Sequence, residues 1–212
     1  LRIWDLLNDT SRVLRGHTNS VRSVMKLNET TIVSSSDDNT LRIWDLLNDT
    51  SRVLRGDTSY VWSVMKLNET TIVSGSEDRT LRIWDLKNDT SRVLNGHTNT
   101  VLSVMKLNET TIVSGSGDNT LRIWDLLNDT SRVLRGHTDG VFSVMKLNET
   151  TIVSGSWDNT LRIWDLLNDT SRVLNGHTSG VNSVMKLNET TIVSGSGDNT
   201  LREWDLNKLP QQ

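Results

Sequence analysis

The chain has 212 residues, a formal net charge of −3 and no cysteine. The missing cysteines exclude disulfides, thiolate metal sites and a cysteine nucleophile, and they favour a reducing compartment. A slightly acidic chain is a poor match for nucleic acid or an anionic membrane, because both need a basic face. No apolar run approaches the roughly 20 residues that span a bilayer. We therefore expect a cytoplasmic protein that binds neither nucleic acid nor membrane.

One hexapeptide recurs with a period of 40 residues. Leu-Arg-Ile-Trp-Asp-Leu begins at residues 1, 41, 81, 121 and 161 and returns, altered, as Leu-Arg-Glu-Trp-Asp-Leu at 201. The repeats are 1–40, 41–80, 81–120, 121–160 and 161–200, with a partial sixth at 201–206, so that 1–206 forms one repeat domain. Residues 207–212 break the period and are predicted to be a C-terminal tail. The first residues resemble neither a signal peptide nor a natural start, and we interpret Leu1 as internal to a longer parent chain.

The turn signals divide each period into four short strands. In chain order these are residues 11–14, 21–27, 30–34 and 41–46, separated by turns at 16–18, 28–29, 38–39 and 48–50. The strand at 21–27 alternates, and the strand at 30–34 is rich in β-branched residues. Nothing apolar recurs at a helical period. The chain is predicted to be all-β.

The repeat resembles the WD40 family in four features. These are the 40-residue length, the four strands, a Gly-His pair near one end and a Trp-Asp pair near the other. The resemblance implies a β-propeller of four-stranded antiparallel blades, in which strand a begins at Val21, b at Thr30, c at Leu41 and d at Ser51. Five a, b and d strands stand beside six c strands. Three arrangements stay open: a closed five-bladed ring, an arc of a larger ring, and half of a ring made by two chains.

All four histidines occupy the same repeat position, which argues against a hydrolase triad and for a repeated structural role. In WD40 blades this histidine, a serine of strand b, the aspartate of the b–c turn and the strand-c tryptophan form a hydrogen-bonded tetrad. Ser34 is preferred over Ser36 for the first tetrad, although both face the same way. The implied tetrads are His17, Ser34, Asp38, Trp44; His97, Ser114, Asp118, Trp124; His137, Ser154, Asp158, Trp164; and His177, Ser194, Asp198, Trp204.

The second repeat has Asp57 where the others have histidine. It faces Ser74, Asp78 and Trp84 in the implied tetrad. Two carboxylates at one site repel each other or share a proton. We expect this blade to be locally looser than the others.

Other motifs indicate no chemistry. The Asn-Asp-Thr and Asn-Glu-Thr triplets, as at Asn8 and Asn28, match the glycosylation pattern but also match ordinary Asx turns, which we favour. There is no calcium loop, phosphate-binding loop, zinc-protease motif or nucleophile elbow. We predict no catalytic residue, no metal and no cofactor.

The repeats differ at nine of the 40 positions, and eight of these lie in or beside the d–a connection and the b–c turn. Both connections lie at the same end of an up-and-down sheet. We call this end of the blades the top face. All four aromatic residues outside the Trp-Asp pairs fall there, and aromatic and arginine side chains dominate binding hot spots. The predicted partner-binding residues are Ser20, Arg22, Asp37, Tyr60, Trp62, Glu77, Arg79, Thr100, Leu102, Asp139, Phe142, Trp157 and Asn182.

These features predict a non-enzymatic module that binds a protein or peptide through its top face. Nearly identical repeats with a few variable positions resemble the WD40 arrays of NTPase-linked, NLR-like sensor proteins. Two alternatives remain: a designed or purely structural repeat without a natural ligand, and a propeller that binds glycans by aromatic stacking. A homo-oligomer is expected if five blades do not close alone.

Overall fold

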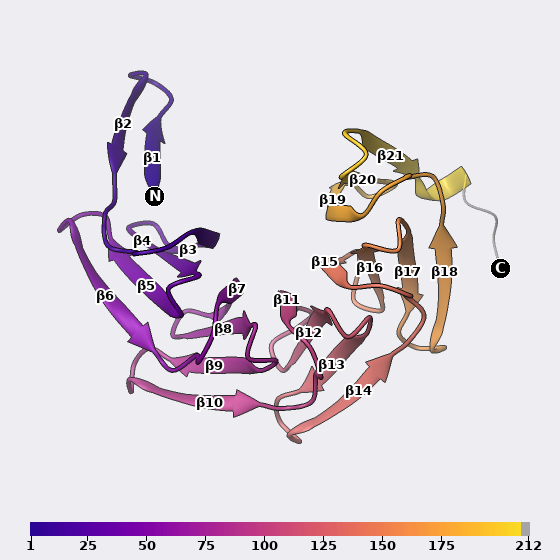
Figure 1. Cartoon of the computed structure of the whole chain (residues 1–212), viewed down its shortest axis with the longest axis horizontal. Coiled ribbons are helices and arrows are strands. Elements are labelled where there is room, and N and C mark those ends of the chain that lie inside the picture. Colours follow the sequence, from indigo (N-terminus) through magenta and orange to yellow (C-terminus); the bar gives the residue numbers. More distant parts are fainter. Residues whose placement is uncertain (209–212) are drawn as a thin grey trace.

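The computed structural model describes residues 1–208, and the rest of the predicted tail lies outside them. Its strands form antiparallel sheets that follow the 40-residue period (Figure 1). Within residues 1–208 the one helical element is the short 3₁₀ turn η1 (Leu206–Lys208), which occupies the start of the tail. No helix among the described residues is long and apolar enough to cross a bilayer.

Four sheets are complete blades with strands in the order a-b-c-d, as the repeat predicts. Blade 1 holds β3 (Val21–Asn28), β4 (Thr31–Ser36), β5 (Thr40–Asp45) and β6 (Thr50–Arg55). Blade 2 holds β7 (Val61–Asn68), β8 (Thr71–Ser76), β9 (Leu81–Asp85) and β10 (Thr90–Leu94). Blade 3 holds β11 (Val101–Lys106), β12 (Thr111–Ser116), β13 (Leu121–Asp125) and β14 (Thr130–Leu134). Blade 4 holds β15 (Val141–Lys146), β16 (Thr151–Ser156), β17 (Leu161–Asp165) and β18 (Thr170–Leu174).

The two ends of the chain form incomplete sheets. At the N-terminus β1 (Arg2–Asp5) and β2 (Thr10–Val13) make a two-stranded hairpin with c and d sequences. At the C-terminus β19 (Val181–Asn188), β20 (Thr191–Ser196) and β21 (Leu201–Asp205) make blade 5, which has a, b and c strands. The prediction of an all-β propeller of four-stranded blades is confirmed, with four blades complete.

The core lies between blades, because each sheet buries one apolar face against the next sheet. Between blades 3 and 4, for example, Met105, Leu121 and Ile123 pack against Val144 and Trp164. The same repeat positions form the cores between blades 1 and 2, 2 and 3, and 4 and 5. Burying a side chain of this size is worth about 1.5–3 kcal/mol, so every blade depends on its neighbours.

The blades form an open arc, and the β1–β2 hairpin and blade 5 lie on opposite sides of its opening (Figure 1). The closed ring is therefore not confirmed. Strand β2 pairs with β1, and β21 pairs with β20, so the described strands include no pairing of β2 with β21. The repeat pattern specifies the blade, whereas closure depends on the angle between sheets, which the pattern does not encode.

Candidate functional site

Each histidine of the repeat bridges two elements of its blade near the top face. In blade 3, His97 Nδ1 lies 2.8 Å from Asp118 Oδ2, and its Nε2 lies 2.8 Å from Ser114 Oγ. The indole Nε1–H of Trp124 donates to the same Ser114 Oγ at 2.8 Å. The structure brings together the other three predicted sets in the same way, around His17, His137 and His177.

The contacts of the first tetrad show which of its two candidate serines, Ser34 or Ser36, belongs to it. Ser34 Oγ lies 2.8 Å from both His17 Nε2 and Trp44 Nε1. Ser36 Oγ instead donates to the Asn19 carbonyl and accepts from the backbone N–H of Asp38. Ser36 therefore shapes the b–c turn and stands outside the tetrad.

The tetrad aspartate holds both connections of the top face. Asp38 accepts the backbone N–H groups of Thr18 and Thr40, together with the Thr40 hydroxyl. Burial opposes the charge, but the bonds from Thr40, Thr18 and His17 outweigh it and lower the Asp38 pKa to about 2. An ionised carboxylate only accepts, so His17 Nδ1–H donates to it and Nε2 accepts from Ser34. The polar groups of the first tetrad then satisfy one another.

Asp57 breaks this arrangement in blade 2. Its side chain is only 1% exposed and accepts one hydrogen bond, from Ser74 Oγ at 3.2 Å, while Oδ1 has no hydrogen-bond partner. The nearest cation is Arg82, whose Nε lies 3.5 Å from Oδ1. Burial first, and then the charge of Asp78, raise the Asp57 pKa to about 6.

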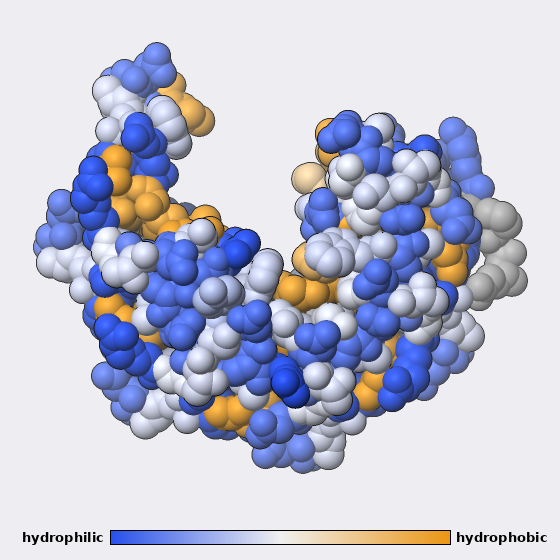
Figure 2. Space-filling model, in the orientation of Figure 1, coloured by the Kyte–Doolittle hydropathy of each residue, from blue (hydrophilic) through white to orange (hydrophobic). Residues whose placement is uncertain are grey.

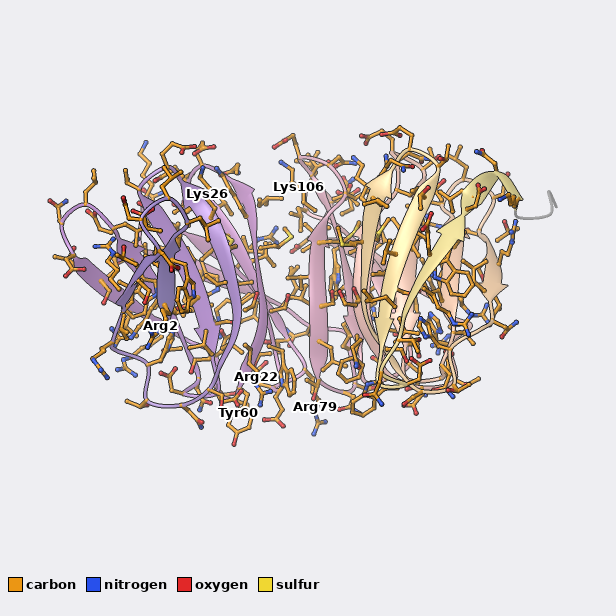
Figure 3. All side chains as sticks on the ribbon, turned by 90° about the horizontal axis from the view of Figure 1, so that it is seen from above. Arg2, Arg22, Lys26, Tyr60, Arg79 and Lys106 are labelled. Carbon is orange, nitrogen blue, oxygen red and sulfur yellow. The ribbon has the colours of Figure 1, made fainter. Side chains whose placement is uncertain are left out.

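The variable side chains gather at the predicted edge of the molecule. Figure 3 shows Arg22, Tyr60 and Arg79 at one end of the sheets, whereas Lys26 and Lys106 lie at the opposite end. The d–a connections and b–c turns that carry the variable positions are joined by backbone bonds such as Glu77 N–H to the Tyr60 carbonyl, at 2.8 Å. The variable residues therefore share one surface.

Three of the predicted residues form a first cluster across blades 1 and 2. Arg22 makes a two-point ion pair with Asp37, at 2.7 and 2.6 Å. Its guanidinium also lies 4.3 Å from the ring centroid of Trp62, as a cation–π contact. The Asp37 carboxylate is buried and positions Arg22, whose side chain stays partly exposed. A direct contact of Asp37 with a partner stays a prediction.

A second cluster joins blades 4 and 5. The rings of Phe142 and Trp157 stack with centroids 4.1 Å apart and an interplanar angle of 16°. Trp157 Nε1–H donates to Asn182 Oδ1 at 3.3 Å, yet the residue remains 51% exposed. Asp139, Trp157, Asn159 and Asn182 line an open hollow of about 380 Å³ beside this stack.

The other predicted residues lie on the same face, where the Ser20 carbonyl accepts the backbone N–H of Asp37 at 2.9 Å and Asp139 lines the hollow beside Trp157. Tyr60, Glu77, Arg79, Ser20 and Asp139 are exposed, whereas Thr100 and Leu102 are half-buried. Glu77 accepts a hydrogen bond from the Ser59 hydroxyl at 2.6 Å. Among the described residues no group of three or more His, Cys, Asp or Glu could hold a metal ion.

Comparison with known proteins agrees with this geometry. The model of the WD domain, G-beta repeat (WD40), matches residues 8–45, 48–85, 88–125, 128–165 and 168–205. The chain belongs to the WD40 family. A search of curated proteins returned no significant match. Among solved structures, the one described as "Structure of U3-55K" is similar, with a TM-score of 0.85 and 24% sequence identity. The similarity covers 93% of this chain and 64% of that one, so the chain spans less than two thirds of its length.

One residue that the sequence reasoning missed is needed by the second cluster of this WD40 chain. A Cβ on Gly180 would lie 2.5 Å from Trp157 Cδ1, closer than real contacts allow. The sequence signal for Gly180 is that glycine stands at a position that varies between repeats, in the repeat that follows Trp157. Gly180 thus leaves room for the tryptophan of the preceding blade.

We expect Gly180→Ala to displace Trp157 from Phe142 without unfolding the WD40 arc. The added methyl meets the indole, which can swing outward because half of it is exposed. Near-ultraviolet circular dichroism should lose the signal of the stacked pair, while far-ultraviolet spectra stay unchanged. The control is Gly140→Ala, whose added Cβ would meet Phe142 at an ordinary 3.4 Å. Unchanged aromatic signals in Gly180→Ala would contradict the packing.

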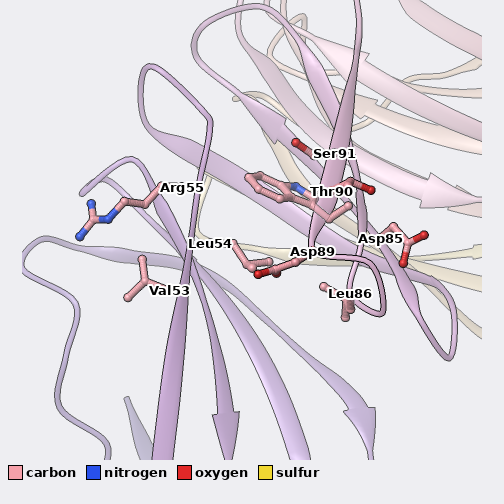
Figure 4. Close-up of a pocket in the computed structure, with 9 residues that line it drawn as sticks. Val53, Leu54, Arg55, Asp85, Leu86, Asp89, Thr90 and Ser91 are labelled. Atoms are coloured by element: carbon pink, nitrogen blue, oxygen red, sulfur yellow. The ribbon is translucent and has the colours of Figure 1, made fainter.

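The outer side of the WD40 blades also carries hollows. One hollow between blades 1 and 2 is lined by Leu54, Arg55, Trp84, Asp85 and Asp89 (Figure 4). An equivalent hollow recurs one blade further on, lined by the corresponding residues. Apart from Arg55, whose equivalent is Asn95, it is built from residues that the repeats share, so it follows from stacking blades.

Proposed function

We propose that this chain is a non-enzymatic module that recognises a protein or peptide through its top face. WD40 propellers are in general protein-interaction modules. The observation that carries the proposal is the exposed aromatic stack of Phe142 and Trp157 beside an open hollow. A large aromatic side chain that stays half-exposed is the kind of anchor that dominates hot spots.

The backbone of blade 2 supports the same surface. Arg79 has a φ of 74°, at a position where the other blades have asparagine. Asparagine tolerates this left-handed conformation, whereas arginine there costs of order 1 kcal/mol. Such strain is typical of residues kept for binding. Together, Arg22, Arg79, Glu77 and Asp139 place both signs of charge around the aromatic anchors, which favours a partner of mixed charge.

Recognition of a sugar has less support. Stacking on a sugar needs an open aromatic face, but Phe142 covers one face of Trp157 and Gly180 lies against its edge. A ligand that inserts a side chain beside this pair, as a peptide does, matches the hollow better.

The test is selection of peptides from a random display library on the immobilised chain, with a glycan array in parallel. Trp157→Ala should weaken the selected peptides about tenfold or more, since hot-spot truncations cost about 2 kcal/mol. The control is Leu127→Ala, because Leu127 is also a large apolar residue and is even more exposed, at 76%, but lies in a c–d turn at the opposite end. Peptides that bind Trp157→Ala and wild type alike would refute this site, and glycans bound in their place would refute the peptide class.

A further inference from the structure

The two clusters of the top face occupy the same three positions of the repeat, at the junction between neighbouring blades. In the first cluster these positions hold Arg22, Asp37 and Trp62, and three repeats later they hold Phe142, Trp157 and Asn182. The first cluster is complete in itself, because its guanidinium is bound by the carboxylate and lies over the indole. A junction of this kind can therefore hold a guanidinium between a carboxylate and an indole.

The second cluster has an aromatic ring where the first has its guanidinium, and beside it lies the hollow of about 380 Å³. Asp139 and Trp157 line this hollow from blade 4, and Ser179 and Asn182 line it from blade 5. Among the described residues that line the hollow, Asp139 is the one charged group, and none is basic. The lining of the second junction thus offers a carboxylate and an indole without a guanidinium.

Asp139 also removes a hydrogen bond that another repeat makes within the top face. In blade 3 the equivalent residue is Asn99, whose Oδ1 accepts the N–H of the next residue at 2.8 Å while its Nδ2 donates to the Gly117 carbonyl at 3.1 Å. Asp139 Oδ1 accepts the N–H of Gly140 at 2.7 Å in the same way. The shared orientation puts its second oxygen where Asn99 has Nδ2, next to the carbonyl of Trp157. Two acceptors then face one place, and a ligand with N–H donors would satisfy both.

The other acidic residues of the predicted partner-binding set already have donors. Asp37 is paired with Arg22, and Glu77 accepts the Ser59 hydroxyl at 2.6 Å. Figure 2, which views the molecule onto the top face, shows mostly hydrophilic and neutral residues over the blades. A polar group with a positive charge therefore matches the hollow better than an apolar or acidic side chain does.

We propose that this hollow binds the guanidinium of an arginine side chain in the partner. The inference rests on the proposed recognition of a protein or peptide, and it names the side chain that the second cluster takes. The guanidinium would donate to the Asp139 carboxylate and to the Trp157 carbonyl, with the aliphatic stem of the arginine packed beside the indole. Arg22 makes the same kinds of contact within the first cluster.

Arginine matches this lining better than lysine. Its guanidinium is planar and presents five N–H donors in a fixed fork, so it can reach a carboxylate and a carbonyl together. The ammonium of lysine is a strongly hydrated point charge, and an open hollow gives it little in exchange for its water. Citrulline, the neutral isostere, keeps the shape of arginine but lacks the charge that Asp139 would bind.

The test follows the indole N–H signal of Trp157 by nuclear magnetic resonance while Nα-acetyl-arginine amide is added. Trp157→Phe assigns this signal among the eight tryptophans. The signal should shift in a saturable way with a Kd in the millimolar range, as expected for a single side chain. The lysine amide should bind more weakly, and the citrulline amide about tenfold more weakly, because charge-assisted hydrogen bonds are the stronger ones. Lysine or citrulline bound as tightly as arginine, or no shift at all, would overturn the proposal.

Asp139→Asn is the decisive variant, and the fold accepts it because asparagine stands at the same position in blades 1 and 3. It should weaken binding of the arginine amide about tenfold, because the carboxylate becomes neutral and the new amide can donate to the Trp157 carbonyl. Glu149→Gln is the matched control, since Glu149 is an exposed carboxylate of the same blade at the opposite end, and it should leave binding unchanged. Equal affinity of Asp139→Asn and wild type would also overturn the proposal.

Peptides selected on the immobilised chain separate this inference from the proposed function. Peptides that need Trp157 but bind equally well when each arginine is replaced by citrulline would leave top-face recognition standing and overturn the arginine site. Peptides that ignore Trp157 would overturn the proposed function and this inference with it. Peptides that need both Trp157 and an arginine, and that lose affinity for Asp139→Asn, would support both.

Discussion

Replacing Asp57 by histidine should stabilise blade 2 by about 3 kcal/mol at pH 7.5. Burial keeps the pKa of Asp57 at about 6 in the folded chain, roughly two units above its ordinary value of 3.8. Each unit corresponds to about 1.4 kcal/mol. The folded state binds the proton more tightly than the unfolded state, so the stabilisation from protonation is complete below about pH 4 and lost as the pH rises through 6. A histidine would also bond both Ser74 and Asp78, as His97 does with its partners.

Hydrogen exchange of the amides in β7–β10 is the appropriate measurement, because repeat arrays need not unfold as one unit. Asp57→Asn serves as the reference that carries no titrating group. The protection of wild-type blade 2 should rise between pH 7.5 and pH 5 relative to Asp57→Asn, while blade 4 should show no such difference. Equal pH profiles for the wild type and Asp57→Asn would show that the carboxylate carries no such penalty.

Ser114→Ala should cost blade 3 about 2–4 kcal/mol. One hydroxyl satisfies both His97 Nε2 and Trp124 Nε1, and both groups are buried. A buried polar group left without a partner costs about 1–3 kcal/mol. Denaturant unfolding and local hydrogen exchange should both report the loss.

Ser74→Ala is the matched control for this loss, because its blade lacks the histidine. In the wild type it would also take from Asp57 its one hydrogen bond, so it is measured in an Asp57→Ala background, where it strands only Trp84 Nε1. The cost in blade 2 should therefore be clearly smaller than in blade 3. Equal losses would mean that the histidine adds little to the tetrad.

The strands and the surface of the variable residues could be predicted from the sequence because they depend on the repeat alone. A period of 40 residues with four turn signals specifies a blade, and the two connections at one end of an up-and-down sheet place Trp62 and Trp157 on one face. The contacts between variable residues could not be predicted. Whether Asp37 meets a partner or Arg22 depends on distances between neighbouring loops, which the period does not contain.

The open shape of the arc could not be predicted from the sequence, for a related reason. Closure depends on a few degrees of rotation at each interface between sheets. These interfaces are built from the same residues in every blade, so any small rotation accumulates along the chain. The sequence pattern specifies the structure of each blade, but it does not determine the sum of the small rotations between blades.

The hydrogen bonds of the tetrad aspartate also affect how the repeats can change during evolution. Asp38 and its equivalents hold the backbone of both top connections through groups that every repeat shares, such as the N–H groups of Thr18 and Thr40. The variable side chains of the top face therefore do not determine the backbone conformation of the connections that carry them. Recombination between near-identical coding segments could exchange or duplicate a whole 40-residue repeat. The new repeat would bring a new combination of surface residues on a blade whose backbone already fits its neighbours.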